Sequence, residues 1–486
     1  MSLGAVLNSA RSSLAAISGR TQVTSENISN VDNPGYSRRI AETVASGHGV
    51  LRLSIGRAED RDILAQMLIY TSRHAAGKAL SEGLDKIGLV HGDLDSEVSP
   101  AALMSRLQAD LQAFTAMPDS ATAAARAVGT ARDLAQSIRR GAEAAAALRR
   151  NADKEIAHSV ARINGLLKKF HAANAAIITG RLSDAEMVRN ADARDQILTQ
   201  LAEEVDIRTV PQADGGLAIY TRGGAVLYEH GARQIGFTPS ANLQAGASGG
   251  RILIDNVPVT GAGAVMKLDS GRIGGLIELR DGAAAQWEVQ LDEMARGLIS
   301  AFAEHDQTGA GPDAPGLFSW SGAPGLPAAG THHPGLARDL HINALADPQA
   351  GGNAFLLRDG GMAGAAYVAN GNGVSGFTGR LLELQGALDE PRDFDPAAGL
   401  SAQATVKDFA AQSVSWLQEG RAEAARRTDY DAALLTRASD SLSRATGVDL
   451  DNELEVMMRL ERSYQATARV LTTVDNMLSA LMNSMR

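Results

Sequence analysis

Apolar residues recur at both ends of the chain with the periodicity of a helical seam. In the N-terminal segment the intervals alternate between three and four positions, through Leu3, Leu7, Ala10, Leu14, Ile17, Thr21, Thr24, Ile28 and Val31. The C-terminal segment keeps one such register, interrupted only at Glu453 and Thr467, through Leu450, Met457, Leu460, Tyr464, Leu471, Val474, Leu478, Leu481 and Met485. This heptad pattern predicts an amphipathic helix at each end. An isolated helix of this length is only marginally stable, so each needs a partner, either the other end of the chain or a neighbouring copy.

A turn signal follows the N-terminal seam. Proline at position 34 disfavours helical geometry in Asn33 before it. Gly35 comes next, and a glycine is free to adopt the positive φ that a type II turn requires. The sequence therefore predicts that the N-terminal helix stops at this point and that the chain reverses at Gly35.

Several long helices are predicted within residues 59–205. Ser99 and Pro100 have the form of an N-cap followed by proline at the first helical position, and Pro118 ends that helix. Another heptad register marks a very long helix that begins near Asp119, through Ile156, Val160, Ile163, Leu167, Phe170 and Ile177. The region is therefore expected to form a bundle of long helices.

Ser183 and Glu186 form a capping-box pattern, which predicts a further helix from there to about Glu204. The pattern of apolar residues changes after this helix. Four short β-rich runs separated by turn residues follow, VDIRTV, GLAIYT, AVLYEH and RILIDN. We predict a mainly α fold with a small β insert. The predicted segments are a terminal helix region at 1–58, helices at 59–205, a small β module at 206–275, a helix at 276–308, Gly/Pro-rich loops and a mixed region at 309–402, helices at 403–446 and a terminal helix region at 447–486.

Composition narrows the function classes. A chain of 486 residues with 44% hydrophobic residues can fill real cores. Its net charge of −10 argues against nucleic acid as a partner, because that binding needs clustered Lys and Arg. The absence of cysteine removes disulfides, thiolate metal sites and a cysteine nucleophile. No run approaches the ~20 apolar residues of a membrane span, and no signal-peptide core is visible near the N-terminus. Taken alone, these features predict a cytoplasmic protein without membrane insertion.

Two patterns imitate chemical sites. Residues 371–376, GNGVSG, satisfy G-x-G-x-x-G, but a dinucleotide site needs this loop after a core strand, and the preceding AGAAYVAN is short and weak. His332 and His333 have no further ligand at helical spacing, so we interpret them as part of a solvated loop. We predict no catalytic, cofactor-binding or metal-binding residue. An enzyme with a nucleotide bound at 371–376 stays as the alternative of another class.

Two distant motifs resemble one known superfamily. The stretch from Ser25 to Arg38, SENISNVDNPGYSR, resembles the signature of flagellar rod, hook and hook-associated proteins, an Asn-rich helix end before a Gly-Tyr or Gly-Phe turn. Its motif residues are Asn27, Asn30, Asn33, Pro34, Gly35 and Tyr36. The stretch from Gly447 to Leu481 is similar to the C-terminal end of the same superfamily, including its YQA core. The two motifs agree in order and position.

Within that superfamily the chain resembles the hook-associated protein 1 family, found at the hook-filament junction. The YSR that ends the turn motif is closer to the pattern of this family than to the lysine-bearing form usual in rod and hook proteins. The long helical region 60–205 also resembles this family. The segment from Gly274 to His305 is similar to the family's internal helix and loop. A hook or rod subunit is the alternative. The stretch between Phe318 and Leu340 is short, so the outer β domain of larger relatives is expected to be reduced or missing.

The resemblance carries expectations about function. It implies a structural subunit that joins hook and filament, located outside the cell, with no enzymatic activity and no cofactor. It implies export through the flagellar type III apparatus without a cleaved signal peptide. The implied partners are further copies in a ring, the hook protein, the second hook-associated protein and a cytoplasmic export chaperone at the C-terminal helix.

The resemblance also implies that the two terminal helices pair as a coiled-coil inner domain, from which the turn motif leads into the outer helical domain. The residues expected in the seam are Leu3, Leu7, Leu14, Ile17, Ile28, Val31, Leu450, Met457, Leu460, Tyr464, Leu471, Val474, Leu478 and Leu481.

Overall fold

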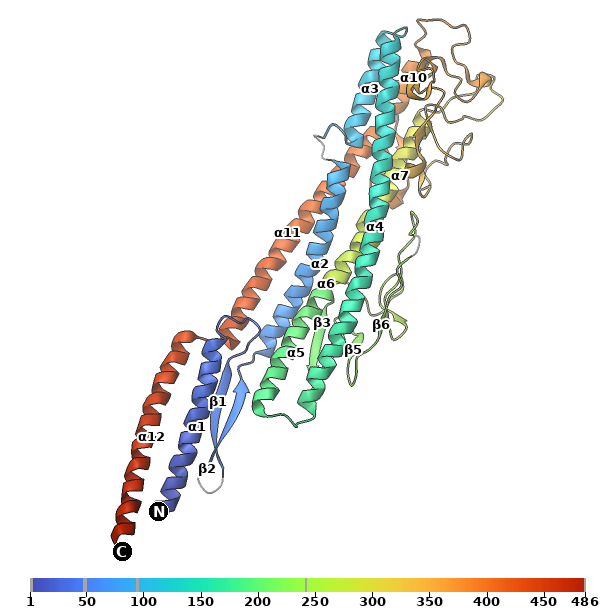
Figure 1. The fold of residues 1–486 in the computed structure, drawn as a ribbon. Coiled ribbons are helices and arrows are strands. Elements are labelled where there is room, and N and C mark those ends of the chain that lie inside the picture. The colour runs from blue at the N-terminus through green and yellow to red at the C-terminus, as the bar shows by residue number, and fades with distance from the viewer. Residues whose placement is uncertain (1–2, 47–49, 93–95, 241–242, 485–486) are drawn as a thin grey trace.

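The chain forms a long, slender and mainly helical molecule with both termini at one end (Figure 1). The structure is a computed structural model, and it describes residues 3–46, 50–92, 96–240 and 243–484. The predicted fold class is confirmed, because helices dominate, the sheets are small and the two terminal helices lie side by side.

The terminal end of the molecule is a three-layered unit, which we call the terminal module. Its layers are α12 (Leu450–Ser484), α1 (Leu3–Ser29) and an antiparallel hairpin of β1 (Arg39–Ser46) and β2 (Val50–Arg57). Helix α1 lies between α12 and the hairpin and contacts both (Figure 1). The sequence pattern predicted the two helices but not the hairpin.

The rest of the molecule, which we call the rod, is built on long helices that run along its length (Figure 1). They are α2 (Arg61–His91), α3 (Pro100–Ala116), α4 (Ala121–Ile178), α5 (Asp184–Glu204), α6 (Gly271–Ile277), α7 (Ala284–Ala301) and α11 (Val406–Thr446). A π-helical turn, η2 (Glu278–Ala283), joins α6 to α7.

The helix boundaries follow the capping signals. The Ser99 hydroxyl accepts from the backbone N–H of Ala102 and caps α3, whose first residue is the proline. Ser183 and Glu186 form the predicted capping box at α5, with each side chain bonded to the other residue's backbone N–H. These predictions are confirmed, as is the very long helix that begins near Asp119.

Close helix packing fills the core of the rod. Helix α4 buries many alanines, and where α7 crosses it a glycine, Gly141, faces Trp287 and Leu291. A Cβ at Gly141 would lie 3.1 Å from the nearest methyl of Leu291, so the helix axes approach more closely than a larger residue permits. Both Trp287 and Leu291 are fully buried. Small residues on α4 thus let the helices pack closely, although the chain has few aromatic side chains to fill space between them.

The β module lies against α4. Its two antiparallel sheets are β3 (Ile207–Pro211), β4 (Leu217–Thr221) and β5 (Val226–Tyr228), and β6 (Ile235–Gly236), β7 (Leu253–Ile254) and β8 (Val257–Pro258). Asn164 of α4 bonds both the N–H and the C=O of Ile235, and Phe170 meets Tyr228 edge-on at 4.9 Å between ring centres.

Two buried arginines fasten this module to the helices. Arg149 of α4 pairs with Glu288 and donates to the carbonyls of Gln244 and Ala247. Arg280, on the π-helical turn, pairs with Asp153 of α4 and donates to the carbonyl of Gly250. These buried charges are paired, and an unpaired buried charge would cost several kcal/mol.

The far end of the rod consists mostly of loops. Its short elements are β9 (Phe318–Ser319), α8 (Leu336–Asp339), β10 (His341–Ile342), η3 (Pro348–Ala350), α9 (Leu356–Asp359), η4 (Ala365–Tyr367), α10 (Gly379–Asp389), β11 (Arg392–Asp393), η5 (Pro396–Ala398) and β12 (Gln403–Ala404). The glycine loop 371–376 follows the 3₁₀ turn η4 and not a strand, so it lacks the setting of a dinucleotide site.

One sequence interpretation here is wrong. His332 does not lie free in a solvated loop, because its Nε2 lies 2.9 Å from the carboxylate of Asp292 on α7. Asp292 is buried and also accepts from the backbone N–H groups of Gly335 and Ala337. The carboxylate therefore pins the loop to the helix. The bond to Asp292 raises the pKa of His332 above its usual value, although burial opposes the rise, and Glu293 and Asp395 add to it.

A pH-dependent contribution to stability follows from this pair. The folded-state pKa of His332 lies above the unfolded value of about 6.5, so the contribution is complete below that pH and disappears as pH rises through the folded value. We expect His332→Leu to lower the free energy of unfolding by about 1.5–3 kcal/mol at pH 6 and by less at pH 9. Thermal unfolding at both pH values measures this, with His333→Leu as the neighbouring control. An equal loss at both pH values would contradict the assignment.

Candidate assembly site: the terminal module and its joint to the rod

The seam between α1 and α12 is apolar and unevenly buried. On α12 the most buried apolar side chains are Leu460 and Val474, at 4% and 6% exposure, and they lie two heptads apart on one face. On α1 the buried apolar side chains are Ala10, Ala16 and Val23. They are buried because α1 is covered on one side by α12 and on another by the hairpin.

The residues predicted for the seam fall into three groups. Leu460 and Val474 are buried, and seven are half-buried, namely Leu7, Leu14, Ile17, Ile28, Met457, Leu471 and Leu478. Three are exposed in the single chain, namely Val31, Leu450 and Tyr464. Val31 lies beyond the end of α1 and Leu450 is the first residue of α12, so neither sits inside the helix pair. The side chains of Leu3 and Leu481 lie outside the described residues.

Asn27 locks the end of α1 to the hairpin. Its side-chain amide donates to the backbone carbonyl of Arg39 at 3.0 Å, and its oxygen accepts from the N–H of the same residue at 2.9 Å. The oxygen also accepts from the hydroxyl of Tyr36 at 2.8 Å. Asn27 is 1% exposed. Burial raises the pKa of Tyr36 to about 12, so this hydroxyl stays a donor at physiological pH.

The turn motif differs from the predicted geometry at its glycine. Gly35 does not adopt a positive φ, and the Asn33 side chain accepts from its N–H at 3.1 Å. The glycine instead leaves room for a side chain of the rod. A Cβ there would lie 2.0 Å from the side-chain nitrogen of Gln196 on α5, which donates to the Gly35 carbonyl at 2.9 Å. Gly35 therefore permits close contact between the turn and the rod. Asn30 holds the preceding helix end through a bond to the carbonyl of Glu26, and Pro34 is exposed.

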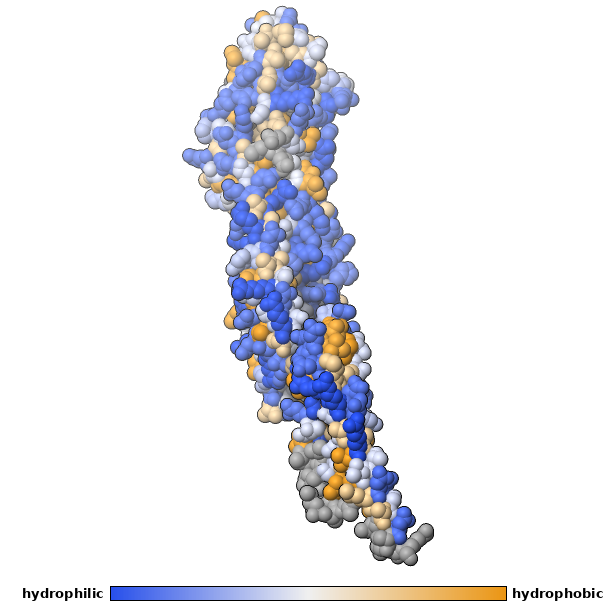
Figure 2. Space-filling view, turned by 90° about the vertical axis from the view of Figure 1, so that its left-hand side faces the viewer, coloured by the Kyte–Doolittle hydropathy of each residue, from blue (hydrophilic) through white to orange (hydrophobic). Residues whose placement is uncertain are grey.

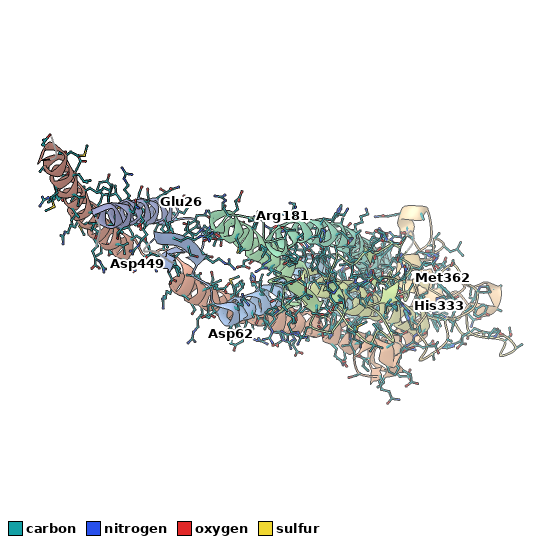
Figure 3. The ribbon with its side chains drawn as sticks, turned by 90° about the horizontal axis from the view of Figure 1, so that it is seen from below. Glu26, Asp62, Arg181, His333, Met362 and Asp449 are labelled. Atoms are coloured by element: carbon teal, nitrogen blue, oxygen red, sulfur yellow. The ribbon has the colours of Figure 1, made fainter. Side chains whose placement is uncertain are left out.

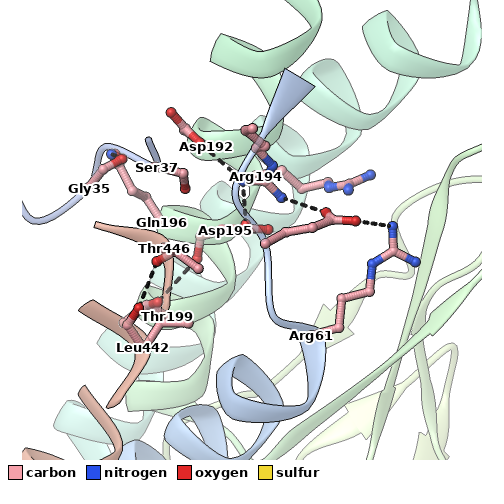
Figure 4. Close-up of polar contacts among 12 residues, drawn as sticks. Gly35, Ser37, Arg61, Asp192, Arg194, Asp195, Gln196, Thr199, Leu442 and Thr446 are labelled. Carbon is pink, nitrogen blue, oxygen red and sulfur yellow. Dashed lines mark hydrogen bonds and ion pairs between the residues drawn. The ribbon is translucent and has the colours of Figure 1, made fainter. Parts of the chain in front are cut away.

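Charged pairs connect the terminal module to neighbouring elements. The guanidinium of Arg38 lies 2.6 Å from the carboxylate of Glu453 on α12, and Glu453 is 1% exposed. The backbone N–H of Arg38 donates to the carbonyl of Thr446 at the end of α11. Arg39 and Arg57 of the hairpin pair with Asp192 of α5 at 2.6 and 3.0 Å. Figure 4 shows the α5 side chains facing the turn and the end of α11. The sequence analysis missed these residues, because their partners lie more than a hundred positions away.

An open cleft of about 1030 Å³ lies at the joint between module and rod. Residues 30–37 of the turn, the start of α2, one face of α5 and the end of α11 line it. Figure 3 places Glu26 and Asp449 on the module and Asp62 and Arg181 at the near end of the rod. Among the residues that the structure describes, no three His, Cys, Asp or Glu side chains gather as a possible metal site. Within the same residues, no helix is both long and apolar enough to cross a membrane.

Comparison with known proteins agrees with this architecture. Residues 92–317 match the family described as flagellar hook-associated protein FlgK helical domain. Residues 442–485 match the family described as flagellar basal body rod FlgEFG protein C-terminal. Both family descriptions name parts of the flagellum, and the two matched segments lie in separate parts of the chain.

Two individual proteins extend the comparison beyond these segments. Flagellar hook-associated protein 1 of Bacillus subtilis (strain 168) is 22% identical over 528 residues, covering 99% of this chain and 98% of the relative. The flagellar hook junction protein FlgK from Burkholderia pseudomallei shares the fold, with a TM-score of 0.57 at 12% identity, over 78% of this chain and 99% of that one. The chain is thus similar to flagellar hook-associated protein 1 along nearly its whole length.

Proposed function

We propose that this chain forms the junction between hook and filament, as an assembly subunit and not an enzyme. One observation carries the proposal: a rod that matches the hook-associated helical domain ends in a module of paired terminal helices. The names of its relatives, hook-associated protein 1 and hook junction protein, support the same location. A hook or rod subunit is less well supported, since only residues 442–485 match the rod family.

We also propose that copies of the chain assemble through the terminal module. After α12 pairs with α1, large apolar side chains on α12 stay exposed, namely Leu450, Leu454, Met458, Tyr464, Val470, Met477 and Met482. Figure 2 shows orange, hydrophobic side chains among hydrophilic ones at this lower end of the molecule. Apolar patches of this kind mark protein contacts. A ring of copies around the flagellar axis buries them.

The remaining expectations rest on the similarity to hook-associated protein 1. We propose contacts with the hook protein and with the second hook-associated protein at either side of the ring. Export through the flagellar type III apparatus requires no cleaved signal, and a cytoplasmic chaperone at α12 would cover its apolar residues before export. We keep the predicted division of the chain, with 1–58 and 447–486 as the inner domain and 309–402 as a reduced outer domain.

Immunogold electron microscopy of isolated flagella tests the junction assignment. We expect antibody against this chain to label one narrow band where hook meets filament. Label along the whole hook would instead assign the chain as a hook subunit. A deletion of residues 450–486 provides the matched control, because it removes α12 and should eliminate the band while the rod is still expressed. A band that persists in the deletion strain would contradict assembly through the terminal module.

A further inference from the structure

One carboxylate on the rod holds both strands of the hairpin. Arg39 and Arg57 are paired across the hairpin register, at its open end. Both guanidinium groups reach Asp192 on α5, at 2.6 and 3.0 Å, and Arg57 also reaches Asp195 at 2.7 Å. The hairpin is therefore docked on a pair of acids one helical turn apart on α5.

Burial of these charged side chains costs free energy of desolvation. The side chains of Arg39, Arg57 and Asp192 are only 5%, 9% and 8% exposed. Burial raises the pKa of Asp195 even though Arg57 lies beside it, so desolvation outweighs attraction at that carboxyl. Buried ion pairs of this kind contribute little net stability, and their best supported role is to select one geometry.

Two further hydrogen bonds join the hairpin and the turn to the same helix. The backbone N–H of Ile55 in β2 donates to Asp184 at the start of α5, at 3.0 Å. The side chain of Gln196 donates to the Gly35 carbonyl in the turn. The open cleft lies beside these contacts, between the turn, α2, the same face of α5 and the end of α11. These polar contacts therefore join the turn and the hairpin to α5 beside an open cleft.

We propose that the hairpin is an electrostatic latch, which by docking on Asp192 and Asp195 fixes the direction in which the terminal helices leave the rod. Without the carboxylate at 192, the two arginines lose their common partner and the hairpin samples several positions over the cleft. Copies in a closed ring need one inclination, and the latch provides it within each chain. The inference concerns the single chain and holds wherever in the flagellum the protein is placed.

Distance measurement between two spin labels tests the latch. The chain has no cysteine, so Ser54→Cys in β2 and Ala172→Cys in α4, both at exposed positions, give one defined pair in the full-length protein. We expect a single narrow distance distribution, and at least a doubling of its width in Asp192→Asn. Glu203→Gln is the matched control, because Glu203 lies on the same helix and pairs with Arg162 at the surface. Its distribution should stay narrow.

Two results would overturn the proposal: a narrow distribution in Asp192→Asn, or a broad one already in the labelled parent protein. If Asp192→Asn does not fold, the double variant Arg39→Met with Asp192→Leu replaces the ion pair by apolar contacts. This variant should keep its melting temperature and still show the broad distribution. The measurement uses isolated chains, so its failure leaves the junction assignment untouched, and failure of the immunogold experiment leaves the latch untouched.

Discussion

Leu460→Asp is expected to abolish incorporation of the chain into flagella and with it motility. Leu460 is the most buried apolar side chain of α12, in the seam against α1. Burial of one leucine contributes about 1.5–3 kcal/mol, and the substitution also places a charge in an apolar contact. The two helices should separate before the rod loses its fold. Electron microscopy of the variant strain and swimming assays measure the result.

The control for this variant is Leu382→Asp, which adds the same charge at a leucine 56% exposed on the far end of the rod. We expect normal flagella from the control strain. We also expect the purified Leu460→Asp protein to keep the melting temperature of the rod, which has its own core. Normal motility of the Leu460→Asp strain would show that the seam is dispensable.

Asn27→Ala is expected to free the hairpin from the end of α1. The substitution leaves the backbone N–H and C=O of Arg39 and the hydroxyl of Tyr36 without their present partner, in a buried position. Each unsatisfied group costs about 1–3 kcal/mol, so a total near 3 kcal/mol is a cautious expectation. Since 1.4 kcal/mol is a factor of ten, amide exchange in β1 should accelerate more than ~100-fold. Hydrogen exchange of the purified chain measures it.

Asn30→Ala serves as the comparison within the same motif. Asn30 is half-buried, and its amide donates to the carbonyl of Glu26 one turn earlier in its own helix end. We expect its loss to change exchange in β1 by less than tenfold, because no hairpin contact is removed. Similar acceleration in both variants would mean that Asn27 acts as a general helix-end residue and not as the specific lock between α1 and the hairpin.

Prediction from sequence succeeded where the determining contacts are local. Capping at Ser99 and at Ser183 with Glu186 depends on residues within one turn, so short patterns marked where α3 and α5 begin. The four β-rich runs lie where β3, β4, β5 and β7 form, for the same reason. The resemblance of two motifs was also readable without coordinates. The C-terminal motif lies within the matched segment 442–485, and the N-terminal motif lies outside both matched segments.

Prediction failed where two distant segments meet. The register of Leu460 identified one face of α12, but nothing near Ala16 or Val23 indicated that a hairpin would cover α1 on a second side. We predicted a positive φ for Gly35 because a local sequence pattern shows only that glycine has a free backbone. In the structure it leaves room for the side chain of Gln196, which lies 161 positions later in the chain.

The sequence by itself therefore determined the helices, their caps, the β insert and the superfamily, since periodicity and capping act between near neighbours. Only the tertiary structure decided how the terminal module is held. In the sequence nothing distinguishes Asp192 from the other acidic residues of α5. Its role arises because the fold brings Arg39 and Arg57 against it. A side chain's burial and charge partners depend on segments far away in the chain, and one sequence does not record which segments meet.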